Sequence, residues 1–270
     1  TRRSSDLIKN KNIELYKSHK YTLSVTGCTG YIKKEFEKEK VAAKKSQKEF
    51  NNPESEYYQM TPEQIISKWE EKGRVSCKYG TLLDEYIELK LNNKLADIEL
   101  WKLDNNYDCD DRLQSNCIAF DNFLTNIYAK TDYEYVTREE KMYVISKDEY
   151  NVLNGRFDCL FYSKSLNKYV IIDWKSTAVI ETQNNFNEKL LGPLFNYDAC
   201  NANEYTIQLQ MYKKALVETY GITNANNIDI FICQLHDKNY KLYKQNIEYD
   251  SDLLDKVINF ACKKHAIKKN

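Results

Sequence analysis

The chain has 270 residues, enough to bury a substantial core in one large domain or two small ones. Its 40 basic and 40 acidic residues cancel, which disfavours a protein that coats nucleic acid stoichiometrically and leaves only local patches for such contacts. No stretch approaches the roughly 20 apolar residues of a membrane span and no signal peptide is visible, so we expect a soluble, intracellular, cytoplasmic protein with no membrane partner.

The N-terminal half has the residue spacing of helices. A charged helical run is expected over residues 33–50. A second helix starts at Thr61-Pro62-Glu63-Gln64, which supplies an N-cap, a proline at the first helical position and a capping-box glutamine. Gly73 is expected to end that helix, and further helices are predicted over residues 75–91 and 111–129.

From residue 131 onward, apolar and polar residues alternate as they do in strands. The predicted elements are strands over residues 133–145, 155–163 and 168–176, a helix over 206–220 closed by Gly221, strands over 228–235 and 240–247, and a helix over 253–267. We predict an α/β fold in a single domain, residues 1–270. A mainly helical part would cover 1–130, a central mixed β-sheet flanked by helices 131–250, and a C-terminal helix 251–270.

Two segments, Gly155-Arg156-Phe157-Asp158 and Ile172-Asp173-Trp174-Lys175, predict an acidic hairpin. A turn at residues 164–167 would place Asp158 opposite Asp173, with both carboxylates on one face. Cross-strand Cβ atoms lie about 4.5–5.5 Å apart, so the two charges repel unless a divalent cation such as Mg²⁺ lies between them. Lys175 would project from the same face about 7 Å along the strand, where its ammonium can hold an attacking water or a phosphate oxygen.

This register also brings Arg156 opposite Lys175, a repulsion that a splayed strand end would relieve. The simpler alternative for the whole hairpin is a solvated face with scattered charges. The apolar residues before Asp173 and around Asp158 favour an interior strand instead, where unpaired charge is costly.

The hairpin is one of several motifs that occur in order along the chain. The others are Leu23-Ser24-Val25-Thr26, Trp69 followed by Gly80-Thr81-Leu82-Leu83-Asp84 and Glu88, Arg138-Glu139-Glu140 before the hairpin, and Gln208-Leu209-Gln210-Met211-Tyr212 after it. Together they resemble the PD-(D/E)XK nucleases, in the branch that contains RecB-type, lambda-type and CRISPR-associated RecB-like exonucleases. The resemblance covers about residues 20–220 and implies a restriction-endonuclease-like core.

The resemblance also implies a role for each polar group of the hairpin. Asp158, Asp173 and the backbone carbonyl of Trp174 would bind Mg²⁺ or Mn²⁺, and Lys175 would orient or activate the attacking water.

The helix before the hairpin carries two further candidate metal ligands. Asp84 stands where the family usually has histidine, and aspartate adds a hard oxygen ligand with a shorter reach. Glu88, one turn later on the same helix face, is the alternative ligand. Glu85 is a weaker candidate because it lies about 100° around the helix from Asp84. A solvated helix face is the other interpretation of all three.

Gln208 and Tyr212 are the remaining candidate catalytic residues. They lie four residues apart on a predicted helix, so both can face the hairpin. Their amide and phenol would hold the substrate backbone or the lysine of the hairpin. The alternative for Tyr212 is packing in the core.

These residues predict a metal-dependent deoxyribonuclease. Because phosphate contacts carry no sequence information, we expect little base specificity on DNA, single- or double-stranded. An exonuclease acting on DNA ends is favoured, since the Q-x-x-x-Y branch is rich in end-processing enzymes. The alternatives are a catalytically silent nucleic-acid-binding relative, an endonuclease of the same fold, and an unrelated scaffold protein. Whether the chain is a monomer or a homo-oligomer, such as a ring around DNA, is left open.

The eight cysteines are dispersed and include no C-x-x-C pair, so we interpret them as reduced core thiols. Those of the C-terminal half are too far apart in the sequence to converge on a cluster, and we expect no iron–sulfur cluster. The three histidines lie beside no candidate nucleophile, which disfavours a Ser-His or Cys-His hydrolase.

Overall fold

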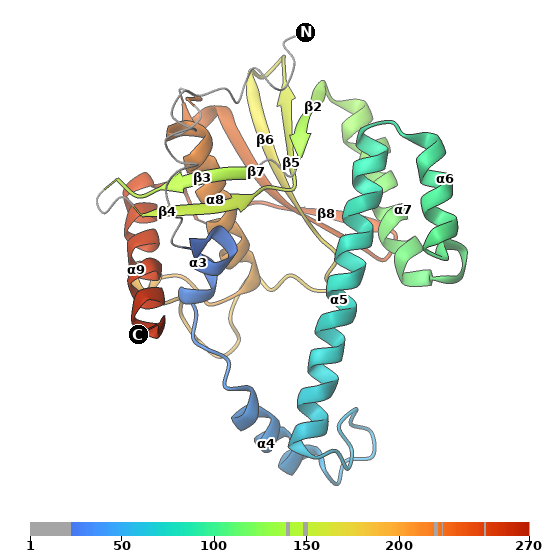
Figure 1. The fold of residues 1–270 in the computed structure, drawn as a ribbon, viewed down its shortest axis with the longest axis vertical. Helices are drawn as coiled ribbons and strands as arrows, with labels where there is room; N and C mark the ends of the chain where they lie inside the picture. Colours follow the sequence, from blue (N-terminus) through green and yellow to red (C-terminus); the bar gives the residue numbers. More distant parts are fainter. Residues whose placement is uncertain are drawn as a thin grey trace.

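The computed structural model describes residues 23–138, 141–147, 151–218, 221–222, 224–245 and 247–269. Within these residues the chain forms two mixed β-sheets and seven α-helices, which confirms the predicted α/β class (Figure 1). Of the helices that this part of the chain contains, none combines the length and apolarity needed to cross a membrane. The assignment to a single domain stays a prediction.

The larger sheet contains the predicted hairpin. Its strands are β2 (Tyr133–Arg138), β5 (Cys159–Ser163), β6 (Lys168–Lys175), β7 (Ile228–His236) and β8 (Asn239–Tyr243), in the order β2-β5-β6-β7-β8. Strands β6 and β7 run parallel, and the other neighbouring pairs run antiparallel. Because β6 is central and covered on both faces, its middle is a continuous apolar run.

The smaller sheet contains parts of two segments that the alternation of apolar and polar residues predicts as single long strands. It consists of β1 (Leu23–Ser24), β3 (Lys141–Ile145) and β4 (Val152–Arg156) in the order β1-β4-β3. The predicted strands over 133–145 and 155–163 are therefore each divided between the two sheets. Alternation continues through both halves, so the sequence does not reveal where a strand changes partner. In the first segment, β2 ends at Arg138 and β3 begins at Lys141, and residues 139–140 lie outside the described residues.

Helices cover both faces of the larger sheet. On one face pack α5 (Pro62–Leu91), α6 (Leu95–Asp104) and α7 (Asp111–Asn126); on the other lie α3 (Val25–Tyr31), α8 (Asn201–Glu218) and α9 (Ser251–Lys269). Alternate hairpin residues enter the two cores. Leu160 and Ile171 pack toward α8, whereas Phe161 and Ile172 pack toward α7. Asp173, two residues after Ile171, therefore faces the α8 side.

Helix α5 is continuous over 30 residues, so the prediction that Gly73 ends it is wrong. The capping box at Thr61 and Gln64 forms as predicted. Glycine inside a helix costs about 1 kcal/mol relative to alanine. The tertiary packing of α5 at both ends offsets this cost: Ile65 is buried near its start and Ile87 near its end.

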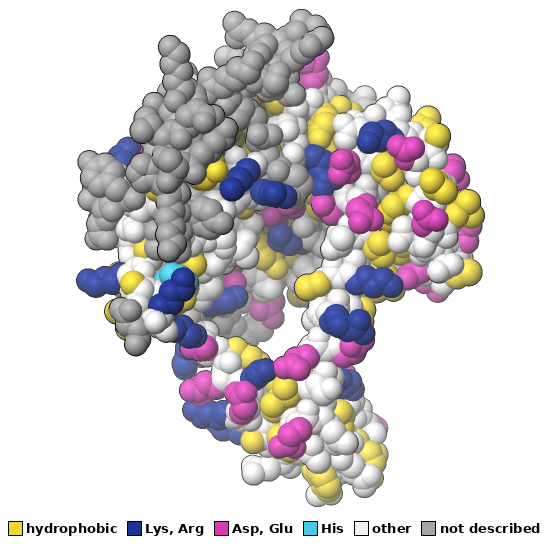
Figure 2. Space-filling view, in the orientation of Figure 1, with side chains coloured by type: hydrophobic (Ala, Val, Ile, Leu, Met, Phe, Trp, Pro, Cys, Tyr) yellow, Lys and Arg dark blue, Asp and Glu magenta, His cyan; other side chains and the backbone are white. Residues whose placement is uncertain are grey.

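The N-terminal half of α5 and the helix α4 (Lys38–Glu49) form an arm that extends away from the sheets (Figure 1). A small apolar cluster of Ala42, Tyr57 and Ile65 joins them. A 2.7 Å ion pair between Lys38 and Glu70 lies beside it. Figure 2 shows a hollow between this arm and the body of the molecule, with Lys and Arg side chains along its borders.

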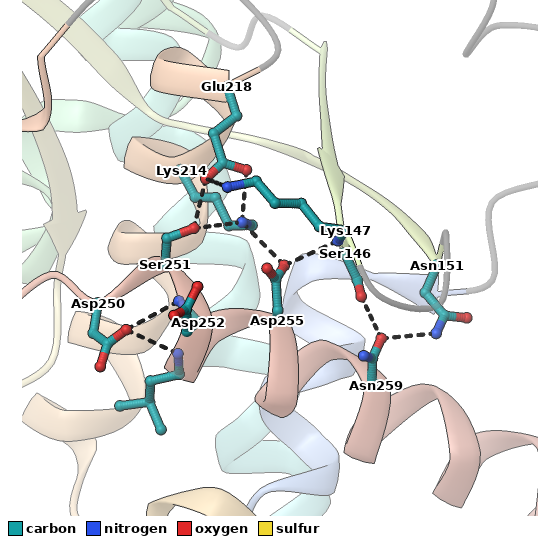
Figure 3. A network of polar contacts seen from close by, with 11 residues as sticks. Ser146, Lys147, Asn151, Lys214, Glu218, Asp250, Ser251, Asp252, Asp255 and Asn259 are labelled. Atoms are coloured by element: carbon teal, nitrogen blue, oxygen red, sulfur yellow. Dashed lines mark hydrogen bonds and ion pairs between the residues drawn. The ribbon is translucent and has the colours of Figure 1, made fainter.

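A buried polar network fixes α8 against α9 and the β3 end (Figure 3). Lys214 is only 1 % exposed and lies 2.6 Å from Glu218 and 3.0 Å from Asp255. Lys147, just after β3, adds a 3.1 Å contact to Glu218. Because an unpaired charge at this depth is costly, these contacts define one position for α8 relative to the sheet.

Several element boundaries differ from the prediction by a few residues. Helix α8 begins at Asn201, five residues earlier than the apolar spacing indicates. Gly221 has φ +76°, the left-handed conformation that suits a residue following a helix, although residues 219–220 lie outside the described part. Strand β8 ends at Tyr243, short of the predicted 247.

Candidate functional site

The hairpin has the predicted register. The pairing starts with Cys159 opposite Ile172 and Leu160 opposite Ile171, and extending this register by one residue places Asp158, just before β5, opposite Asp173. Arg156 does not belong to this sheet. It is the last residue of β4 (Val152–Arg156) in the smaller sheet, where it pairs with Lys141. Arg156 is thus removed from Lys175, and the repulsion that the extended register implied does not arise.

Asp158 lies at the start of β5, where its carboxylate is held by the neighbouring strand. Its Oδ2 atom accepts a 2.8 Å hydrogen bond from the backbone N–H of Trp174. The indole of Trp174 packs edge-on against Phe120 and Phe123 and donates to the Sγ atom of Cys159. The aromatic packing against α7 therefore fixes the strand end that holds Asp158. The role of the Trp174 carbonyl as a metal ligand stays a prediction.

Asp173 is buried, and Lys175, two residues later, is half-buried beside it. Asp173 is 2 % exposed, and its Oδ2 atom lies 2.6 Å from Nζ of Lys175. This contact is an ion pair without hydrogen-bond geometry, so Oδ2 is a buried carboxylate oxygen with no hydrogen-bond donor. The Lys175 ammonium also lies 4.7 Å from the ring centre of Tyr205 on α8. One face thus carries two acids, one cation and an aromatic ring.

Burial and mutual repulsion change the proton affinity of this group. Burial, with the negative charge of Asp173, raises the pKa of Asp158 to about 8, against the opposing effects of Lys175 and the Trp174 N–H. Burial opposes ionisation of Lys175, but the charges of Asp173 and Asp158 outweigh it and raise the pKa of Lys175 above its ordinary value. Near neutral pH Asp158 is therefore mostly protonated and the charges of Asp173 and Lys175 balance, so ionisation of Asp158 would require a further cation.

We expect the stability of the metal-free protein to fall as pH rises from about 4 to about 8. The folded chain binds the Asp158 proton more tightly than the unfolded chain does. That stabilisation is complete at low pH and is lost as pH rises through the folded pKa. Thermal unfolding in EDTA across this range measures it. Asp158→Asn should show a flatter profile, and equal profiles for the two proteins would contradict this interpretation.

The upstream acids lie near the hairpin but are held by Arg138, whose side chain is 6 % exposed. Its guanidinium contacts Asp84 Oδ2 at 2.5 Å and Glu88 Oε2 at 3.1 Å, and it also donates to the Asp84 backbone carbonyl. Burial raises the pKa of Asp84, with Arg138 opposing. Glu85 points elsewhere, accepting from the Trp101 indole at 3.0 Å. The side chains of Asp84 and Glu88 are still 40 % and 51 % exposed, so they lie on a solvated helix face and are paired there with Arg138.

Gln208 and Tyr212 differ in exposure. Gln208 is half-buried and lines a surface cavity between α3 and α8. Tyr212 is 1 % exposed and packs against Phe157 in the core. A Cβ atom at Gly155 would lie 2.8 Å from the Tyr212 ring, so glycine allows this close approach. The packing favours a structural role for Tyr212, while contact of Gln208 with substrate stays a prediction.

A cavity of about 290 Å³ brings one upstream acid and one hairpin acid to the same space, since Asp84 and Asp158 line it together with Trp174 and Lys175, whereas Glu88 and Asp173 do not. Among the described residues, no group of three or more His, Cys, Asp or Glu side chains converges to hold a metal ion. Asp84 is paired with Arg138 instead. Asp158 and Asp173 alone fit a hard divalent cation, because the two carboxylates together carry more negative charge when both ionise than the single ammonium of Lys175 balances.

The sequence reasoning missed two contributors to this site. Arg138 belongs to one of the motifs, but its partner Asp84 lies 54 residues away in the sequence, so no local pattern indicates that the two side chains meet. Tyr205 was recoverable, because it precedes Gln208 by three residues and shares its helix face. The eight cysteines all lie in the described part of the chain, where they form no disulfide, and six of them are buried, as expected of core thiols. The absence of an iron–sulfur cluster stays a prediction.

Comparison with known proteins adds little. No family model matches the chain, and no curated protein matches it. The crystal structure of SSO0001 is similar at 11 % identity and a TM-score of 0.31, covering 71 % of this chain and 75 % of that one. A likeness at this level carries no argument about fold family or function.

Proposed function

We propose that the chain is a metal-dependent deoxyribonuclease of the PD-(D/E)XK type with a restriction-endonuclease-like core. The observation that supports this most is the buried arrangement of Asp158, Asp173 and Lys175 at one strand end. Two carboxylates that are short of positive charge lie beside a lysine ammonium, 2.6 Å from one of them. Such an arrangement is costly for stability, which favours a functional origin.

Asp158 and Asp173 would hold Mg²⁺ or Mn²⁺. When bound, the ion would polarise the phosphodiester and lower the pKa of a bound water. Lys175 is placed to hold a water or a phosphate oxygen at the same face, and Tyr205 keeps its ammonium in position. Asp84 would join the ligand set only by exchanging Arg138 for the ion.

DNA is the proposed substrate, cleaved with little sequence preference and from its ends. A catalytically silent nucleic-acid-binding relative is the second candidate, and the commitment of Asp84 and Glu88 to Arg138 is the observation that favours it. An endonuclease of the same fold is the third. The presence of both hairpin acids and the lysine favours activity over silence.

Purified protein with end-labelled linear DNA and with covalently closed circular DNA tests these candidates. Mg²⁺ or Mn²⁺ should support progressive loss of the linear substrate, and EDTA should stop it. Cleavage of the circle would indicate an endonuclease. Binding of either DNA without cleavage, across both metals, would leave the silent relative. Full activity in EDTA would contradict the proposed chemistry.

A further inference from the structure

A second and larger cavity adjoins the hairpin on its α7 side. It has a volume of about 790 Å³, within the range of ligand-binding pockets. Its lining comes from the start of α7, the segment after β6 and the turn between β7 and β8 (Figure 1). Lys175 and Ser176 line this cavity and also the smaller one that holds Asp84 and Asp158. The two spaces therefore meet at the candidate catalytic lysine.

An unpartnered donor lines the larger cavity. Asn116, in the second turn of α7, is 2 % exposed, and its Nδ2 atom has no hydrogen-bond partner. A buried amide left without a partner costs about 1–3 kcal/mol. Its presence on a cavity wall indicates a ligand that supplies an acceptor oxygen there.

Two cations and several hydroxyl groups surround this amide. The Arg112 guanidinium stacks 4.3 Å over the ring of Tyr79, which holds it at the cavity rim. Lys238 lies in the turn between β7 and β8, and its backbone N–H donates a 3.0 Å hydrogen bond to Ser115 Oγ. Within the described part of the chain, neither Arg112 nor Lys238 has a carboxylate within ion-pair distance.

Residues at the N-terminal end of α7 line the cavity as well; the helix dipole there favours negative charge, and the Asp110 carboxylate already caps the N–H of Leu113. Two carboxylates, Asp111 and Asp237, line it as well, and both are exposed. Amide, hydroxyl and guanidinium donors together with a helix N-terminus are the groups that bind phosphate and sugar oxygens of nucleic acids. The exposed acids disfavour a purely electrostatic site and require the ligand to make hydrogen bonds.

We propose that this cavity binds the stretch of a single nucleic-acid strand next to the phosphate undergoing cleavage, with Asn116 donating to a backbone oxygen and Arg112 contacting a phosphate. This inference rests on the proposed nuclease function, because it places the strand through Lys175, where the two cavities meet. A strand that follows this course passes from the acids of the hairpin to the start of α7.

Binding in EDTA separates this inference from turnover. The probe is a short fluorescein-labelled oligothymidylate, measured by fluorescence anisotropy at several salt concentrations. Asn116→Asp replaces the unpartnered amide by an acceptor of equal size and should weaken binding about tenfold or more. Arg112→Gln should weaken it several-fold and reduce the salt dependence by about one charge. Arg74→Gln, which removes an exposed arginine paired with Glu71, is the matched control and should bind within twofold of the unaltered protein.

Because Asn116 is buried, the thermal unfolding of Asn116→Asp must be measured beside its binding. If Asn116→Asp does not fold, Arg112→Gln still tests the inference, because Arg112 is exposed. Binding by Arg112→Gln equal to that of Arg74→Gln would overturn the inference. So would thymidine monophosphate competing as well as the oligonucleotide, since the cavity would then be a nucleotide site. If the variants lose binding but the unaltered protein never cleaves DNA, the nuclease proposal fails and the strand site stands.

Discussion

Asp173→Asn is expected to abolish metal-dependent cleavage, reducing the single-turnover rate by about 10³-fold or more. The substitution keeps the size of the side chain and removes the charge that Asp173 presents to a cation and to Lys175. The same change relieves the repulsion that raises the pKa of Asp158, so Asp158 can ionise and pair with Lys175 in place of Asp173, and the metal-free variant should keep a stability close to that of the unaltered protein. Loss of activity with stability retained is the signature of a functional rather than a structural acid.

Asp229→Asn is the matched control. Asp229 lies on the adjacent strand β7 and pairs with Lys168 at 3.0 Å, outside both cavities. Its loss should leave cleavage unchanged. Single-turnover assays with end-labelled DNA, run beside thermal unfolding in EDTA, give both quantities. An Asp173→Asn variant that cleaves at the original rate would refute the assignment of the hairpin as the reaction centre.

Features that depend on local sequence were predicted well. The turn after β5 is polar and Asn167 adopts φ +51°, so the alternation on either side sets the register that aligns Asp158 with Asp173. The capping box at Thr61 likewise needs only residues three positions apart. In both cases the determining contacts lie within a short stretch of chain.

Features that depend on distant contacts were not predicted. Gly73 is a local helix breaker, but the burial of Ile65 and Ile87 keeps α5 intact through it. The division of alternating segments between two sheets follows from strand pairing, such as that of β4 with β1, which begins more than 120 residues earlier. Arg138 and Asp84 belong to motifs that the sequence identifies separately, and only the fold shows that they neutralise each other.

That neutralisation bears on how the site would work. With Arg138 in place, the charge of Asp84 at the smaller cavity is balanced by the guanidinium, and the hairpin acids face Lys175 alone. A cation entering between Asp158 and Asp173 would compete with Lys175 for Asp173. Displacement of the ammonium from that carboxylate would leave it free to hold a water or a phosphate oxygen. The ion pair thus keeps the lysine at the site in the absence of metal.

Lys175→Met is therefore expected to reduce the chemical step about 10²-fold or more while leaving Mn²⁺ affinity equal or higher, because the variant removes the cation that competes for Asp173. Methionine preserves much of the length and packing of the side chain. Lys168→Met, at the other end of the same strand, is the matched control, with its partner Asp229 outside the site. Single-turnover cleavage at saturating metal separates chemistry from Mn²⁺ binding, which calorimetry measures independently. If Lys175 serves only to neutralise Asp173, the metal would replace it and Lys175→Met would cleave within a few-fold of the unaltered protein. A large loss of rate at full metal occupancy would indicate a different role. In that case the metal has replaced the ammonium beside Asp173, and the ammonium acts on the water or the phosphate.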